Sequence, residues 1–129
     1  MTFAKAFAAE YPGEIAIQDD RQKLSWDLVD DILNRCANGL QAIDLGPNNR
    51  IAVFAENSVE TALANLGGLV AGASVVPVNF HLTAEEVAYI LSDSEARVLF
   101  VGPETAERGL VAASQSNVHT VIGWGESSE

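Results

Sequence analysis

The sequence predicts an α/β fold, a mostly parallel β-sheet with helices on both of its faces. The first observation is alternation, because short apolar runs of strand length alternate with helical patterns from residue 51 onward. The second is the composition of these runs. Residues 51–55, 74–78 and 98–101 are apolar at nearly every position, as in parallel strands that are buried on both faces. Strand–helix–strand units connect by right-handed crossovers, so we expect a single sheet.

The first part of the chain is predicted to form a helix and a hairpin. The helix covers residues 2–11 and ends at Pro12-Gly13, a pair that breaks helices. Two short strands, residues 14–18 and 23–26, then enclose a polar turn, which is the pattern of a β-hairpin.

A long helix is predicted from Ser25 or Trp26 to about Ala42. Its apolar residues recur at a spacing of three and four, which indicates a face turned to the core: Val29, Ile32, Leu33, Cys36, Ala37 and Leu40. Three aspartates, Asp27, Asp30 and Asp31, crowd its first turns. They would suit a metal ion, but the helix dipole favours negative charge there, so a solvated face is the preferred interpretation.

The next helix is predicted over residues 58–72. Asn57, with Glu60 three residues later, is expected to cap its start. Gly72 is expected to end it, since glycine tolerates the left-handed conformation that follows many helices. The helix is apolar nearly all round, so more than one of its sides should be covered.

The last elements follow the strand at residues 74–78. Thr83 and Glu86 have the spacing of a capping box, which predicts a helix that leads to the strand at residues 98–101. A helix over residues 104–113 and a strand over 120–122 complete the pattern, and residues 123–129 are expected to form a loose tail.

Size and charge exclude several classes of function. The 129 residues suffice for one domain with a single core. The net charge is −11, and the seven basic residues are scattered, so binding to nucleic acid or to an anionic membrane is disfavoured. No apolar tract is long enough for a transmembrane segment, and no secretory leader is evident. Cys36 is the single cysteine, so no disulfide forms within the chain and a cytoplasmic location is expected. Its place on the predicted core face indicates a buried thiol rather than a nucleophile.

One stretch identifies a family. It runs from a helix end through a strand and a helix to the next strand, and the matching positions are Ala71, Gly72, Ala73, Val76, Pro77, Asn79, Leu82, Thr83, Glu86, Tyr89, Ile90, Leu91, Asp93 and Ser94. In order and spacing it resembles the N-terminal subdomain of the adenylate-forming (AMP-binding) acyl-CoA synthetases, or fatty-acid–CoA ligases. The resemblance implies that residues 1–129 are an incomplete N-terminal part of an AMP-binding domain.

The family's chemistry requires parts that this sequence lacks. The resemblance implies ATP, Mg²⁺ and CoA for a complete enzyme, with a Ser/Thr- and Gly-rich loop before Pro-Lys-Gly that binds phosphates. The glycines Gly67, Gly68 and Gly72 lie within a predicted helix and have no following Lys-Ser/Thr, so close helix packing is the preferred interpretation. His81 and His119 lack partners at metal-ligand spacing. We therefore expect no catalytic residue and no metal site, no activity of the chain alone, no tight binding of these ligands, and the remainder of a longer chain as its partner.

One corner retains a possible ligand role. In some relatives the loop after the Val-Pro strand approaches the nucleotide end of CoA through an arginine. Here the loop contains Phe80 and His81, with His81 at the arginine's position, and Arg108 supplies another positive charge. The resemblance implies that these three are candidates for binding CoA, although a loop that contacts only solvent and neighbours remains the commoner case.

Two alternative functions remain open. The first alternative to an acyl-CoA synthetase is part of a peptide-synthetase adenylation domain. The second is a free-standing α/β module that binds a partner and catalyses nothing. Asn79 and the Leu82-Thr83 pair favour the acyl-CoA branch. In each case open sheet edges and an apolar helix face predict self-association.

Overall fold

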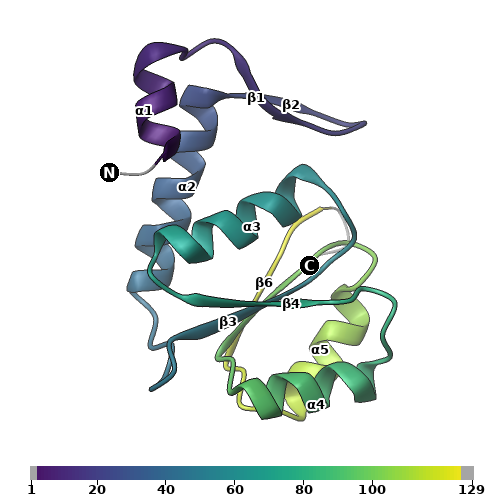
Figure 1. Cartoon of the computed structure of the whole chain (residues 1–129). Coiled ribbons are helices and arrows are strands. Elements are labelled where there is room, and N and C mark those ends of the chain that lie inside the picture. Colours follow the sequence, from purple (N-terminus) through teal and green to yellow (C-terminus); the bar gives the residue numbers. More distant parts are fainter. Residues whose placement is uncertain (1–2, 126–129) are drawn as a thin grey trace.

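The computed structural model describes residues 3–125 and shows an α/β fold built around one parallel sheet (Figure 1). The helices are α1 (Phe3–Glu10), α2 (Trp26–Gln41), α3 (Val59–Val70), α4 (Ala84–Ser94) and α5 (Ala106–Ser114). The strands are β1 (Ile15–Gln18), β2 (Lys23–Ser25), β3 (Arg50–Phe54), β4 (Ser74–Val78), β5 (Val98–Val101) and β6 (Thr120–Gly123). The predicted order of elements is confirmed, with bounds that differ by at most two residues.

The main sheet has four parallel strands in the order β4-β3-β5-β6. Ile51 of β3 lies beside Val75 of β4 and Val98 of β5, which fixes the register at the centre of the sheet. Helix α3 packs on one face, and α4 and α5 cover the other (Figure 1). Helices on both faces are therefore confirmed.

The two faces of the sheet divide the core by the two-residue period of the strands. In β3, Ala52 and Phe54 point to the side of α4 and α5. Ile51 and Val53 point to the side of α3. Both sets are buried, with Phe54 at 0% exposure, which explains why the strand is apolar at every position after Arg50.

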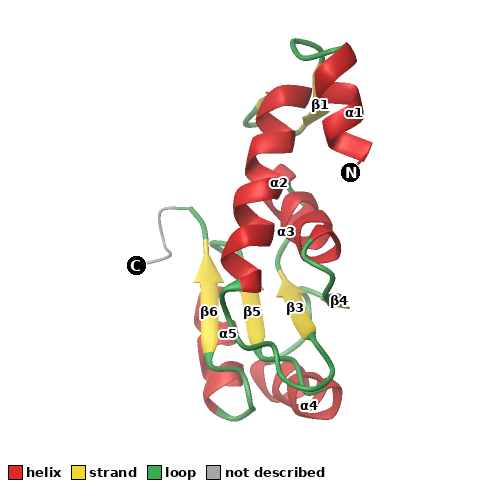
Figure 2. Ribbon diagram, turned by 90° about the vertical axis from the view of Figure 1, so that its left-hand side faces the viewer, coloured by secondary structure: helices red, strands yellow, loops and turns green. Residues whose placement is uncertain are grey.

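Helix α1 and the hairpin β1–β2 lie beyond the carboxyl ends of the strands, and α2 runs from there to the sheet, where Leu40 joins the core (Figure 2). Helix α2 packs along α3. Helix α1 and the antiparallel hairpin β1–β2 pack near the first turns of α2. Together they enclose a separate cluster whose fully buried members include Val29 and Leu33 of α2 and Val59 of α3. The expectation that α3 is covered on more than one side is thus confirmed, because α2 lies on one side and the sheet on another.

Glycines let α3 approach both neighbours closely. A Cβ atom on Gly67 would lie 2.9 Å from Cβ of Cys36 on α2. A Cβ atom on Gly68 would lie 2.7 Å from Cγ2 of Val75, and closer still to Cδ1 of Ile51. Such separations are too short for real Cβ atoms, so only glycine permits this packing at both positions. The glycines are packing residues, as predicted.

The ends of α3 correct one prediction and confirm another. Ser58, not Asn57, caps the helix, because the Ser58 hydroxyl accepts the N–H of Thr61 at 3.1 Å. The helix begins one residue later than expected, which places Val59 in the core with α2. At the other end Gly72 has a φ of +85°, and the N–H of Ala73 donates to the carbonyl of Gly68, as in a Schellman motif.

Side-chain hydrogen bonds connect the turns at the amino ends of the strands. Asn49 precedes β3, Gly72 precedes β4 and Glu95 precedes β5, and all three have positive φ. The Asn49 side-chain amide donates to the carbonyl of Gly72 at 2.8 Å, and the amide of Asn48 donates to the Glu95 carboxylate. These bonds bring three left-handed turns together at one edge of the sheet.

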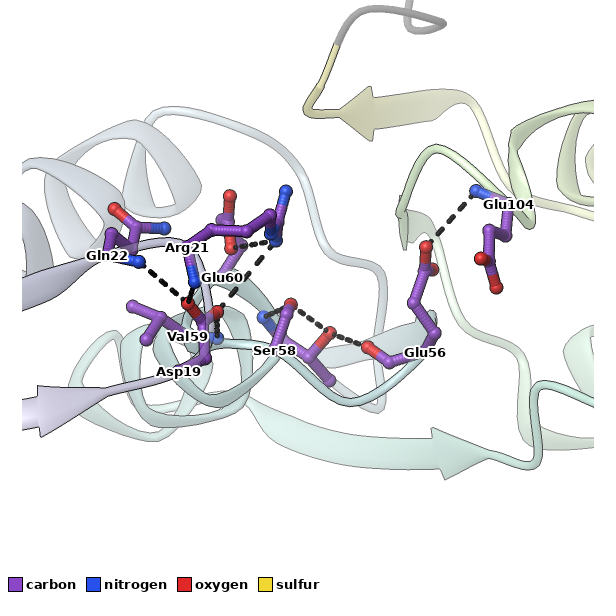
Figure 3. Close-up of polar contacts among 9 residues, drawn as sticks. Asp19, Arg21, Gln22, Glu56, Ser58, Val59, Glu60 and Glu104 are labelled. Atoms are coloured by element: carbon purple, nitrogen blue, oxygen red, sulfur yellow. Dashed lines mark hydrogen bonds and ion pairs between the residues drawn. The ribbon is translucent and has the colours of Figure 1, made fainter.

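Two carboxylates fix helix starts. Thr83 and Glu86 form the predicted capping box, and the N–H and side chain of Thr83 hold the pKa of Glu86 below its usual value. Asp19, in the hairpin turn, caps α3 from forty positions away, because its Oδ2 accepts the N–H of Val59 at 2.9 Å (Figure 3). Its Oδ1 accepts the backbone N–H of Arg21 at 2.8 Å. These hydrogen bonds lower the pKa of Asp19, and the one from Val59 has the largest effect.

The first residues of the expected loose tail, 123–129, are part of the fold. Gly123 is the last residue of β6, and the partly buried side chain of Trp124 packs against the core beside Ile122. The predicted tail is therefore wrong for these two residues, because an aromatic ring at this position covers apolar surface. Residues 126–129 of that prediction lie outside the described part of the chain.

We predict opposite effects for two helical glycines. Gly68→Ala should lower the free energy of unfolding by about 1–3 kcal/mol, because the new methyl group collides with Ile51 and Val75. Gly39→Ala is the matched control, because no atom lies within 4 Å of the added methyl group. It should raise the free energy of unfolding by about 0.5–1 kcal/mol through helix propensity. Urea denaturation followed by circular dichroism measures both, and wild-type stability of Gly68→Ala would contradict the close approach.

We also predict that the Asp19 cap depends on pH. Because the folded state lowers the pKa of Asp19, its stabilisation is present above the unfolded pKa of about 3.9 and is lost as the pH falls through the folded pKa. Asp19→Asn should therefore be less stable than the wild type at neutral pH, and the difference should shrink in acid. Asp20→Asn, at the exposed neighbouring position, serves as the control in urea denaturation. A difference that is equal at both pH values argues against the charged cap.

Candidate functional site

The carboxyl edge of the parallel sheet is where this fold class places ligands. Three loops meet there: residues 55–58 after β3, 79–82 after β4 and 102–105 after β5. The loops after β3 and β5 leave towards opposite faces of the sheet, since β3 leads to α3 and β5 leads to α5. Such a divergence opens a crevice between neighbouring strands in many α/β proteins.

The corner after β4 holds two of the predicted site residues. Asn79 shapes it, because its Oδ1 accepts the N–H of His81 at 2.9 Å. The rings of Phe80 and His81 lie side by side, with centroids 4.1 Å apart and planes tilted by 35°. Phe80 is half-buried against the core, whereas His81 is exposed. The imidazole of His81 is thus exposed to solvent, and it lies against the ring of Phe80, which packs on the core.

Arg108 of α5 is fastened to the same corner. Its Nη1 donates to the carbonyl of Leu82, and its guanidinium carbon lies 5.1 Å from the ring centroid of Phe54. None of the ion pairs of the described residues includes Arg108, so no carboxylate neutralises its charge at close range. The structure therefore places Arg108 beside the loop that carries Phe80 and His81, and the hydrogen bond to Leu82 links them.

A pocket that sequence reasoning missed opens beside the corner. Its volume is about 270 Å³, and its polar lining comes from α3 and the strand-end loops: Asn57, Thr61, Asn65 and Asn79. Phe80 and Pro77 supply part of its apolar wall. Asn57 was predicted to cap α3, and it lines the pocket because Ser58 takes the cap. The available signal was an asparagine after each of two neighbouring strands, because parallel strands bring such residues to one edge.

The crevice between β3 and β5 is filled by the chain itself. Oε2 of Glu56 accepts the N–H of Glu104 at 3.2 Å, across the gap (Figure 3). Its Oε1 packs against Gly102 and, within the described residues, is buried without a hydrogen-bond partner. The fully buried Thr105 donates its hydroxyl to the carbonyl of Phe54 at 2.5 Å. The crevice is therefore closed by a carboxylate, and the open volume lies beside β4.

The remaining reactive side chains are dispersed. Within residues 3–125 no group of three or more His, Cys, Asp or Glu side chains lies close enough together to hold a metal ion. Of the three clustered aspartates, Asp31 pairs with Arg35 at 3.1 Å. Burial raises the pKa of the Cys36 thiol, which favours the unreactive protonated form. His119 contacts the carbonyl of Asp44 at the amino edge of the sheet.

No helix in the described part of the chain is long and apolar enough to cross a membrane.

Comparisons with known proteins are consistent with this geometry. The family model of the AMP-binding enzymes matches residues 4–126. Over 103 residues the chain is 33% identical to the long-chain-fatty-acid–CoA ligase FadD13 of Mycobacterium tuberculosis, covering 79% of this chain and 20% of that protein. Over 101 residues it is 36% identical to the polyketide synthase–nonribosomal peptide synthetase hybrid himA of Aspergillus japonicus, covering 78% of this chain and 2% of that protein.

A solved structure gives the same result. The inhibitor-bound N-terminal domain of FACL13 from Mycobacterium tuberculosis superposes with a TM-score of 0.81 at 29% identity, covering 94% of this chain and 32% of that one. The chain thus spans a fifth or less of the length of these two curated relatives. Since the family model covers nearly every residue, the chain belongs to the family of AMP-binding, adenylate-forming enzymes.

Proposed function

We propose that this chain is the N-terminal part of an ATP-dependent acyl-CoA synthetase, which converts a carboxylate, ATP and CoA into acyl-CoA, AMP and diphosphate. The observation that carries the proposal is the agreement of sequence and fold with acyl-CoA ligases. FadD13 is 33% identical, and the FACL13 domain superposes over 94% of the chain. The single cysteine, Cys36, is in keeping with a cytoplasmic enzyme.

In this proposal the chain supplies scaffold and one binding corner. Phosphate transfer needs donors and cations that surround the phosphates. At the carboxyl edge of the sheet the described residues offer the guanidinium of Arg108, which is in no ion pair, beside an exposed imidazole, and the described residues hold no acidic cluster for Mg²⁺. ATP and Mg²⁺ would therefore be bound mainly by the remainder of a longer chain, which is the partner that the proposal requires.

The corner is proposed to contact the nucleotide end of CoA. His81 is exposed and stands on Phe80, so its ring is presented at a fixed place. Arg108 adds a positive charge that no carboxylate of the described residues pairs with. Imidazole and guanidinium groups both donate to phosphate oxygens, and the guanidinium gives the stronger, bidentate contact.

A peptide-synthetase adenylation domain is the second candidate. The match to the himA hybrid favours it, because that protein contains peptide-synthetase machinery by name and is 36% identical. The two candidates differ in the acceptor of the acyl group, since one transfers it to free CoA and the other to a carrier protein. Formation of acyl-CoA by the enzyme that contains this chain supports the first. Adenylation without CoA transfer supports the second, and a chain that functions alone without adenylation supports a non-catalytic binding module.

We predict that the 129-residue chain shows no carboxylate-dependent exchange of labelled diphosphate into ATP. The enzyme that contains it should show this exchange, because the complete set of phosphate ligands is then present. The isotope-exchange assay, with and without a fatty acid, measures both. Robust exchange by the chain alone would contradict the proposal that the remainder of a longer chain binds ATP and Mg²⁺.

We predict that His81→Ala in the complete enzyme raises KM for CoA about threefold to tenfold, as expected for one exposed contact to a phosphate. KM for ATP and the carboxylate should not change. His81→Arg should keep or lower KM for CoA, because guanidinium binds phosphate more strongly than imidazole. His119→Ala, at the opposite edge of the sheet, is the matched control. An unchanged KM for CoA in His81→Ala would remove the corner from the binding site.

A further inference from the structure

The amide-lined pocket beside the end of β4 suits one kind of ligand group. Three asparagines and a threonine contribute to its lining, and no charged residue of the described chain does. Its volume of about 270 Å³ lies just below the range of about 300–1,000 Å³ that is typical of sites for whole drug-sized molecules. The pocket therefore has room for one polar group of a larger ligand. That group is uncharged, because the lining offers an ionised group no partner of opposite charge.

Two of the asparagines each keep one amide atom available, and the hydrogen bond of the other amide atom shows which one. Asn65 donates through Nδ2 to the carbonyl of Thr61 at 2.8 Å, so its Oδ1 remains as an acceptor. Asn79 accepts the N–H of His81 through Oδ1 at 2.9 Å, so its Nδ2 remains as a donor. Neither remaining atom bonds to another residue in the described part of the chain. The lining thus contains an acceptor from α3 and a donor from the end of β4.

The third asparagine, Asn57, is not needed to cap α3. Asp19 accepts the N–H of Val59 at 2.9 Å, and this hydrogen bond satisfies the first residue of the helix (Figure 3). Ser58 accepts the N–H of Thr61 at 3.1 Å, two residues further on. The exposed side chain of Asn57 makes no hydrogen bond with any described residue, although both of its neighbours in the loop are held in place. A polar side chain that lines a pocket from a fixed loop is pre-organised for a ligand.

The pocket shares a wall with the corner that is proposed to bind CoA. Phe80 lines the pocket, and the centroid of its ring lies 4.1 Å from that of His81. This inference rests on the proposed function, in which His81 contacts a phosphate at the nucleotide end of CoA. Because the two rings are in contact, a group attached close to that phosphate reaches the pocket.

We propose that the amide-lined pocket binds the adenine base of CoA. The edge of adenine carries an amino group beside a ring nitrogen, so it offers a donor next to an acceptor. These match Oδ1 of Asn65 and Nδ2 of Asn79, and Asn57 supplies either kind of atom. The base is uncharged, and its flat face fits the apolar wall of Phe80 and Pro77. The amides in the pantetheine half of CoA also pair a donor with an acceptor, but they have no aromatic face to stack.

Steady-state kinetics of the complete enzyme that contains this chain test the proposal. Asn57→Ala and Asn65→Leu should each raise KM for CoA about threefold to tenfold, because each removes a hydrogen bond to the base, and KM for ATP should not change. Thermal unfolding of Asn57→Ala should match the wild type, because the side chain has no partner among the described residues. Asn34→Ala, at an exposed position of α2 outside the pocket, is the matched control for KM and unfolding.

Changes to the ligand separate adenine from the rest of CoA. The adenosine bisphosphate end of CoA should inhibit competitively against CoA. Its inosine analogue, which has a carbonyl in place of the amino group, should bind about threefold to tenfold more weakly. In Asn65→Leu this difference should disappear, since the acceptor for the amino group is gone. With phosphopantetheine, which lacks adenine, as the acyl acceptor, the asparagine variants should equal the wild type.

Three results would overturn the proposal. One is an unchanged KM for CoA in both asparagine variants, as expected when another segment of a longer chain fills the pocket. Another is an equal loss with phosphopantetheine, which would place a pantetheine amide there, and the third is a rise in KM for ATP alone.

A failure of the proposed function is distinguishable from these results, because the wild-type enzyme would then form no acyl-CoA. In that case calorimetric titration of the enzyme with the adenosine bisphosphate decides the role of the pocket. Binding that Asn57→Ala weakens supports an adenine site, whereas absent or unchanged binding overturns it.

Discussion

The approach of α3 to the sheet is the contact on which the rest of the molecule depends. At Gly68 the helix backbone lies directly against Ile51 and Val75, which belong to neighbouring strands. At Gly67 the next helix, α2, comes equally close. Two glycines in sequence thus set the spacing of three layers, and α2 in turn carries α1 and the hairpin. Because the sheet and the N-terminal elements meet through α3, an error in its position would disturb both.

The sequence predicted the elements of this fold well because its patterns are local. Apolar runs gave the buried strands, and the spacing of three and four gave α2 and its core face. The capping box at Thr83 and the left-handed Gly72 were also read correctly, since each depends on residues within one turn. The prediction that Asn57 caps α3 was wrong, because the next residue, Ser58, is an equally favoured capping residue and the local pattern does not separate the two. Val59, the first residue of the helix, is buried with residues of α2, and that contact is not local.

Long-range contacts were out of reach for the same reason. Nothing near Asp19 indicates that its carboxylate caps a helix forty positions later. The sequence indicates Arg108 by its charge alone, whereas its hydrogen bond to Leu82 depends on how α5 packs against the sheet. The amide-lined pocket required knowing that the ends of β3 and β4 are neighbours, which the strand order settles. The residue types in the sequence predicted which side chains are able to bind a ligand. The strand order and helix packing determine which of those side chains are neighbours.

The fastened turns at the amino edge carry a consequence for how such a chain can evolve. Asn49, Gly72 and Glu95 hold left-handed conformations, Asn49 bonds to Gly72 and its neighbour Asn48 bonds to Glu95, so few substitutions are tolerated there. At the opposite edge the loops after β3 and β4 have no positive φ, and several side chains face open volume. Sequence drift is thereby directed to the carboxyl edge, where we propose that CoA binds. Descendants of one ancestral scaffold can exchange their substrates there while the amino edge keeps the strands in register.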